Sequence, residues 1–139
     1  MLFGTTSHTM DNKGRIFFPA KMRSNMSERL IICRSTEDCL MVFSEEEWES
    51  FNERVRQLSY SKGMKLRNYF YSSMQESTID NQGRLLISQA LRELVGLEKD
   101  IIVAGAQTHA QIWDAAKWQA YDESITKEEV LSLMDEQGF

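Results

Sequence analysis

Two short turns rich in aspartate, glycine and arginine are the part of this sequence best suited to contact a charged partner. Asp11 and Arg15 frame the stretch Asp-Asn-Lys-Gly-Arg, and Asp80 and Arg84 frame Asp-Asn-Gln-Gly-Arg. An arginine held just after a turn can donate two parallel hydrogen bonds to the O6 and N7 edge of guanine. Arg15 and Arg84, which directly follow the turns, are therefore of the right chemical type for such a contact with double-stranded DNA.

Further basic side chains follow the first turn. Lys13, Lys21 and Arg23 suit phosphate oxygens, which fix the register of a DNA complex without reading its sequence. The second copy keeps only Arg92 of these three positions. We therefore expect the two copies to contribute unequally to DNA contact.

The remaining turn residues have a supporting role in this hypothesis. Gly14 and Gly83 are predicted to supply the positive φ that a tight turn requires. Asp11 and Asp80 are predicted to hold the turn, or to orient the arginine four residues on, because a carboxylate is repelled by phosphate. The alternative is a plain surface ion pair across the turn, worth roughly 0 to 1 kcal/mol.

The two turns belong to an internal repeat. When each residue from Thr9 to Arg23 is aligned with the residue 69 positions later, six of fifteen positions are identical and four further apolar residues find apolar partners. With the offset increased to 70, Phe43 aligns with Trp113 and Trp48 with Trp118. The chain is therefore a duplicated module, because a repeat of this kind marks a recurring structural unit.

Each module shows the same order of predicted elements. Residues 4–10 and 15–18 are predicted to pair as a short β-hairpin, as are residues 75–79 and 84–87. A short helical stretch follows at residues 20–29 and 88–95, the second ended by Gly96. A second hairpin comes next, formed by residues 30–34 with 40–43 and by residues 101–104 with 111–113.

Helices are predicted to end both modules. Ser44 and Glu47 have capping-box spacing before one amphipathic helix, and Asp114 takes the cap position in the second copy. The connector has another apolar helical face with a predicted break at Gly63. Thr126 begins an acidic terminal helix, which could dock on its own chain or on a neighbour. These elements predict an α+β protein, mainly β with helices, divided into residues 1–60, 61–74, 75–122 and 123–139.

Composition bounds the possible partners. The net charge of −5 and pI of about 5.1 count against a phosphate-containing partner when the chain is taken as a whole. Residues 8–23, however, carry four basic side chains and one acidic side chain, for a local charge of +3. Residues 117–139 carry two basic and six acidic side chains, for a local charge of −4. A basic segment and an acidic tail therefore coexist.

Other chemistries find little support. Cys33 and Cys39 have no metal or redox spacing and are expected to be reduced core thiols, and His8 and His109 are isolated, so no metal or cofactor is expected. No apolar run is long enough to span a bilayer, and no signal peptide is evident at the N-terminus, so we expect a cytoplasmic protein without a membrane partner.

The repeated turns also carry a family resemblance. The stretch TMDNKGRIFFPAKMR resembles the DNA-binding hairpin of the AbrB and SpoVT class, and the doubled Asp-x-x-x-Arg motif over nearly the whole chain resembles the MraZ family. The resemblance implies two tandem AbrB-like modules that exchange hairpins in a pseudo-symmetric β-barrel with flanking helices. It also implies a ring of identical chains, nucleoid association, and repression of the division and cell-wall gene cluster through short direct repeats at its promoter.

Two other classes of function are compatible with a small folded chain. An enzyme is disfavoured because the sequence has no glycine-rich phosphate loop, no nucleophile motif and no clustered metal ligands. An antitoxin-like protein-interaction module without DNA readout is the remaining alternative. The basic character of the first turn favours DNA over that alternative.

Overall fold

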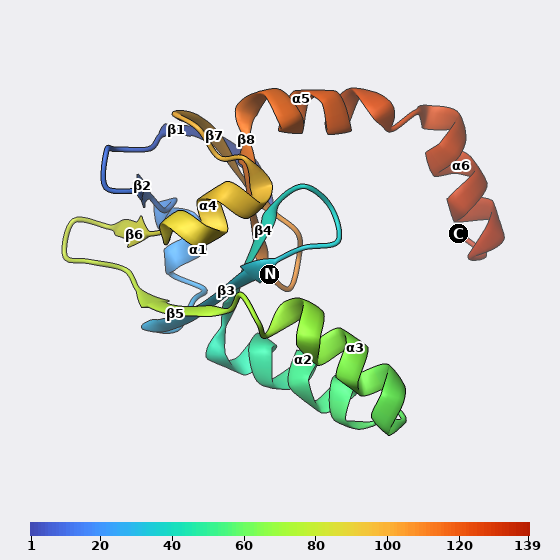
Figure 1. Ribbon diagram of the computed structural model, residues 1–139. Coiled ribbons are helices and arrows are strands. Elements are labelled where there is room, and N and C mark those ends of the chain that lie inside the picture. Colours follow the sequence, from blue (N-terminus) through green and yellow to red (C-terminus); the bar gives the residue numbers. More distant parts are fainter.

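The computed structural model describes residues 1–139, in which strands and short helices follow one another along the chain (Figure 1). The strands are β1 (Thr5–Thr9), β2 (Arg15–Phe17), β3 (Arg29–Arg34), β4 (Leu40–Ser44), β5 (Gln75–Thr78), β6 (Arg84–Leu86), β7 (Asp100–Gly105) and β8 (Ala110–Asp114). The helices are α1 (Ala20–Arg23), α2 (Glu45–Arg56), α3 (Tyr60–Phe70), α4 (Gln89–Val95), α5 (Ala115–Ser124) and α6 (Lys127–Glu136). The predicted class, mainly β with helices, is confirmed.

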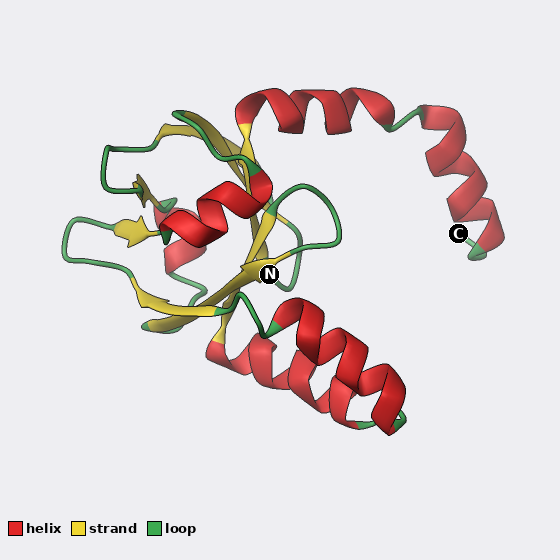
Figure 2. Ribbon diagram, in the orientation of Figure 1, coloured by secondary structure: helices red, strands yellow, loops and turns green.

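One six-stranded antiparallel sheet forms the body of the molecule, in the order β1-β7-β8-β4-β3-β5. The predicted hairpins β3–β4 and β7–β8 lie at its centre and pair with each other through β4 and β8. The two edge strands, β1 and β5, do not pair, so the sheet is not closed into a hydrogen-bonded barrel. Strands β2 and β6 form a separate two-stranded ribbon, whose place beside the sheet is visible in Figure 2.

The strands on either side of each turn pair with the other module, so the predicted local hairpins are wrong. Strand β1 pairs with β7, β5 pairs with β3, and β2 pairs with β6. Only one bridge, between Ile79 and Leu85, crosses a turn within its own module. A half-chain of about 70 residues buries little core, and an isolated hairpin is marginal in water, so exchanging strands stabilises both halves. The interleaving implied by the family resemblance is thereby confirmed.

The core unites the two modules. The larger of two buried clusters contains 17 residues drawn from both halves, including Ile16 and Leu85 from the ribbon. Along β3 the side chains alternate: Leu30 and Ile32 enter this cluster, whereas Ile31 and Cys33 enter a smaller one beneath α2 and α3. Burial on both faces explains why β3 is continuously apolar rather than alternating.

The predicted caps at Ser44 and Gly96 are confirmed, but the predicted end of the first short helix is wrong. The Ser44 side chain accepts a hydrogen bond from the Glu47 N–H, and Gly96 ends α4 in the left-handed conformation with φ 62°. Helix α1 stops at Arg23 instead of continuing to residue 29, because the side chains of Ser24 and Asn25 donate to the Lys21 carbonyl and compete with further helical bonds.

The connector and the C-terminal segment are both helical. Helix α3 runs through Gly63 without the predicted break, because this glycine is buried and its N–H bonds normally to the Ser59 carbonyl. Asp114 does precede α5, but its carboxylate accepts from the Glu98 N–H and leaves the helix uncapped. Helices α5 and α6 form an arm that extends away from the sheet (Figure 1), and neither contains a buried residue.

Candidate nucleic-acid interface

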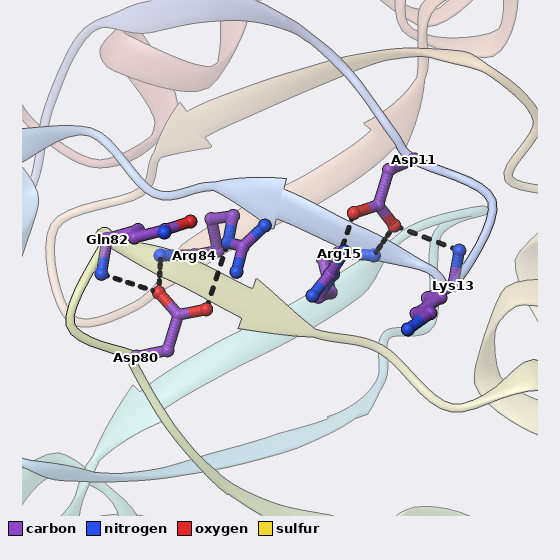
Figure 3. Close-up of polar contacts among 6 residues, drawn as sticks. All are labelled: Asp11, Lys13, Arg15, Asp80, Gln82 and Arg84. Carbon is purple, nitrogen blue, oxygen red and sulfur yellow. Dashed lines mark hydrogen bonds and ion pairs between the residues drawn. The ribbon is translucent and has the colours of Figure 1, made fainter.

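The first turn is held by the Asp11 carboxylate. Its Oδ1 accepts hydrogen bonds from the backbone N–H groups of Lys13 and Arg15, each at 2.9 Å, and its Oδ2 accepts from Arg15 Nε at 2.7 Å (Figure 3). Only Nε of the guanidinium is engaged, so the two terminal nitrogens of Arg15 make no hydrogen bond. The aspartate therefore orients the arginine and leaves its outer edge available to a partner.

The second turn repeats this arrangement with nearly the same distances. Asp80 Oδ1 accepts from the backbone N–H groups of Gln82 and Arg84 at 2.9 Å each, and Oδ2 accepts from Arg84 Nε at 2.9 Å. The glycines have φ of 84° at Gly14 and 80° at Gly83, as predicted for the turns. The turn is thus a geometric repeat as well as a sequence repeat.

Hydrogen bonds within each turn favour the ionised form of the Asp11 and Asp80 carboxylates. The backbone N–H of Arg15, together with its guanidinium and the Lys13 N–H, holds the pKa of Asp11 below its ordinary value. The backbone N–H groups of Arg84 and Gln82, with the Arg84 guanidinium, lower the pKa of Asp80 in the same way. At neutral pH each aspartate is therefore an acceptor for its arginine.

The β2–β6 ribbon carries the two arginines to one outer face. Arg15 lies opposite Leu86 and Phe17 lies opposite Arg84 in the antiparallel register, so the four residues share a face. Figure 3 shows the two turns at opposite ends of the ribbon. The alternate residues, Ile16 and Leu85, point into the core. The ribbon is thus anchored by its inner face and presents its outer face to solvent.

Phe17 and Leu86 were not predicted as site residues, yet they lie on the outer face between the arginines. They are 55% and 47% exposed, which is unusual for large apolar side chains beside a core strand. The period of two in Arg-Ile-Phe-Phe and Arg-Leu-Leu-Ile could have identified them. An apolar side chain at such a position can contact the methyl group of thymine.

Reciprocal backbone bonds lock each turn to the other module. The Ile87 N–H donates to the Gly14 carbonyl at 2.9 Å, and the Phe18 N–H donates to the Gly83 carbonyl at 2.9 Å. Each glycine is buried beneath the following segment of the opposite copy. The relative position of the two arginines is therefore determined by the contact between modules.

The side chain of Arg92 packs against Gly14, and the side chain of Arg23 packs against Gly83. A Cβ atom added to Gly14 would be 2.8 Å from the Arg92 Nε, and one added to Gly83 would overlap the Arg23 guanidinium. Arg92 Nε also donates to the Ile87 carbonyl at 3.1 Å. Both arginines, predicted to contact phosphate, are placed where they support the opposite turn.

Lys13 and Lys21 are exposed, and neither amine makes a hydrogen bond or an ion pair. Lys13 is at the tip of the first turn, and Lys21 lies in α1 just after the ribbon. The second copy offers Gln82 and Ala90 at the matching positions. The difference in charge between the two copies is therefore present on the surface.

Other groups with possible chemistry lie away from this face. Cys33 and Cys39 are free, buried thiols as predicted, and burial raises the pKa of Cys33 to about 12 and that of Cys39 to about 11. The rings of His109 and Phe43 are 5.1 Å apart, and burial lowers the pKa of His109. No three metal-ligating side chains gather in the structure. None of its helices has the length and apolar character needed to cross a membrane.

Comparison with known proteins places the chain in a family. Residues 1–67 and 70–138 match the family described as "MraZ protein, putative antitoxin-like". The sequence is 36% identical to "Transcriptional regulator MraZ" of Acetivibrio thermocellus, in an alignment that covers 96% of this chain and 96% of that protein. Proteins of the same name from Caldanaerobacter subterraneus subsp. tengcongensis and Thermoanaerobacter pseudethanolicus are 34% and 35% identical, over 97% and 98% of each chain. The chain with the doubled Asp-x-x-x-Arg turn belongs to the MraZ family.

Proposed function

We propose that the protein is a transcriptional regulator that binds double-stranded DNA through the outer face of the β2–β6 ribbon. The observation that carries this proposal is the pair of oriented arginines, Arg15 and Arg84, each held at Nε with its terminal nitrogens free. A two-stranded ribbon fits the major groove, and a fixed guanidinium reads guanine. The names of the relatives support the same function.

The register suggests how the two arginines share a site. They are offset by two residues along the ribbon, a distance of about 7 Å at about 3.4 Å per residue. This spans roughly two base-pair steps of 3.4 Å. Phe17 and Leu86 lie between them, so the ribbon face reads a short stretch in which apolar contacts complement the arginine contacts.

The division of labour around the ribbon follows from the positions of the basic residues. Lys13 and Lys21 bind phosphate, because their amines are exposed and unpaired. Arg23 and Arg92 act mainly by supporting the glycine of the opposite turn, although their guanidinium edges can also reach phosphate. Residues 1–60 and 75–122 form the two modules of one DNA-reading unit, residues 61–74 connect them, and residues 123–139 form a separate acidic helix.

Assembly strengthens an otherwise weak contact. About four phosphate contacts in one chain give a salt slope of only about −3.6, which implies modest affinity for an acidic protein. Several copies on one ring, bound to direct repeats, gain roughly 10² to 10⁴ in avidity when the spacings match. We therefore propose that a homo-oligomeric ring represses the promoter of its own division and cell-wall gene cluster, in the cytoplasm at the nucleoid and without enzymatic activity.

A mobility shift with DNA from upstream of the protein's own gene tests this function. The double variant Arg15→Ala/Arg84→Ala should lose specific binding, with each arginine contributing about 1–3 kcal/mol of discrimination, while its circular dichroism is unchanged. Arg29→Ala is a matched control, because this arginine is also ion-paired but pairs with Glu45 and Glu76 away from the ribbon. Specific binding that survives in the double variant would favour the antitoxin-like interaction module instead.

A further inference from the structure

The acidic terminal helix and an apolar groove flanked by basic residues are both left without a partner. Every residue of α6 is exposed, including Leu131 at 60% and Leu133 at 54%. At 3.6 residues per turn the apolar side chains of α6 lie together on one side of the helix, opposite its carboxylates. An amphipathic helix of this kind gains most of its stability when its apolar face is covered.

A groove between α2 and α3 offers a matching surface. It has a volume of about 350 Å³, and five of its six lining side chains are hydrophobic; the lining residues are Phe51, Arg54, Val55, Leu58, Leu66 and Phe70. Leu58 and Leu66 are 40% and 36% exposed, so the apolar lining is open to solvent. Helix α3 has eleven residues and α6 has ten, so both are about 15 Å long.

The charges of the two surfaces are opposite. Residues 53–70, which surround the groove, carry five basic side chains and one acidic, for a net charge of +4; the one acidic residue, Glu53, is ion-paired with Arg56. Residues 122–139 carry one basic and six acidic side chains, for −5. The basic residues are Arg54, Arg56, Lys62, Lys65 and Arg67, and the acidic residues are Asp122, Glu123, Glu128, Glu129, Asp135 and Glu136.

The arm starts on the sheet and leaves the groove of its own chain unoccupied. Trp113 of β8 packs against Trp118 and Tyr121, with ring centroids 5.6 Å and 4.8 Å away, which fixes the start of α5 on the sheet. From there α5 leads outward, and α6 lies across open space from α2 and α3 (Figure 1). All residues of α6 are exposed, so the helix does not fill the groove of its own chain.

We propose that α6 of one copy docks in the α2–α3 groove of the next copy. The helix and the groove are different surfaces, so the contact is head to tail and generates a ring when its rotation closes. This inference specifies the interface of the assembly included in the proposed function. Helix-in-groove docking buries the apolar side of α6, and the flanking carboxylates meet the basic residues beside the groove.

The mass of the free protein tests this interface. Leu131→Asp on the helix and Leu66→Asp in the groove should each convert the assembly to the 16.2 kDa chain. Leu94→Asp is a matched control, because Leu94 is 46% exposed on α4, outside both surfaces. Circular dichroism checks that each variant is folded. Retention of the assembled mass in Leu131→Asp and Leu66→Asp would overturn the proposal.

Cross-linking identifies the chain that supplies the helix. Leu131→Cys and Leu66→Cys, placed on separate chains and mixed, should form a disulfide between chains under mild oxidation. The native cysteines are buried with raised pKa values and should remain inert. A chain carrying both substitutions that cross-links only within itself would show that the arm closes on its own groove, which also overturns the proposal.

DNA binding separates this inference from the proposed function. The monomeric Leu131→Asp variant should still bind DNA with a single repeat as tightly as one site of the wild type does. That result would support both the α6–groove interface and DNA binding by the β2–β6 ribbon. Normal assembly without DNA binding would refute the proposed function alone. If Lys62→Glu/Lys65→Glu weakens single-repeat binding at unchanged mass, the groove serves DNA phosphate and the interface is wrong.

Discussion

The two copies of the Asp-x-x-x-Arg turn have the same internal geometry and different surroundings. The distance from the aspartate Oδ2 to the arginine Nε is 2.7 Å in the first copy and 2.9 Å in the second, and the glycine φ angles differ by only 4°. At the tip of the turn, the first copy has an exposed lysine at position 13 and the second has Gln82. The orientation of the arginine is thus independent of the charge around it.

The glycines of the two turns also meet different neighbours. A Cβ on Gly14 would lie 2.7 Å from the carbonyl oxygen of Ile87, which belongs to the backbone of the other module. The three atoms nearest to a Cβ on Gly83 would all belong to the guanidinium of Arg23, at the end of a flexible side chain. The first turn is therefore confined by backbone, whereas the second is covered by a side chain that can move.

The largest expected difference between the copies concerns stability. Gly14→Ala should lower the free energy of unfolding by about 2–4 kcal/mol. The left-handed conformation costs an alanine about 1–3 kcal/mol, and its Cβ would also overlap the Ile87 carbonyl, which is held in the backbone of the other module. Gly83→Ala should lower it by only about 1–2 kcal/mol, because Arg23 can rotate away. Urea denaturation monitored by circular dichroism measures both, and equal losses would show that the two neighbourhoods are equivalent.

Single arginine substitutions test whether the shared geometry gives a shared function. Arg15→Ala and Arg84→Ala should each weaken binding to the specific site by about 1–3 kcal/mol, because both guanidinium groups present the same free edge. A mobility shift at fixed salt measures the two affinities. A loss confined to Arg15→Ala would mean that the charge around the turn, rather than its geometry, decides which copy reads DNA.

The charge difference at the turn tips should appear in the salt dependence. Lys13→Ala should reduce the magnitude of the salt slope by about 0.9, and Gln82→Lys should increase it by the same amount, because each lysine adds one phosphate contact. Gln82→Ala serves as the control and should leave the slope unchanged. If Lys13→Ala instead weakened binding only to DNA with a particular base at one position, Lys13 would contact that base rather than a phosphate.

The smallest expected effect is a shared acid sensitivity. The pKa of Asp11 and of Asp80 is lowered by turn hydrogen bonds, so their ionisation stabilises the fold above the ordinary value of about 4. That stabilisation should be lost as the pH falls below 4, through each lowered pKa. Denaturation midpoints at pH 5 and pH 3 should differ less in Asp11→Asn/Asp80→Asn than in the wild type. An unchanged pH dependence in this variant would exclude the two carboxylates as its source.

Features that depend on neighbouring residues were predictable from the sequence. The β3–β4 and β7–β8 hairpins, the Ser44 cap and the glycine at the end of α4 each involve groups close together in the chain, and the repeat is visible when the sequence is aligned with itself. The C-terminal end of α1 was missed because side chains that bond to the Lys21 carbonyl compete with helical bonds, and the continuity of α3 was missed because Gly63 is buried within it. The outward position of Phe17 and Leu86 was within reach of the two-residue period but was not inferred from it.

The choice of strand partner depended on tertiary structure. Either side of a turn could have paired locally, and the repeat makes the two modules nearly interchangeable as partners. The exchange is favoured because neither half can bury its own core, whereas the interleaved strands bury Ile16 and Leu85 together. The same packing brings Arg92 to Gly14 and Arg23 to Gly83, a contact between residues far apart in the chain that no local pattern encodes. The sequence alone thus specified two turns able to orient an arginine, and burial of a shared core aligned both arginines on one face.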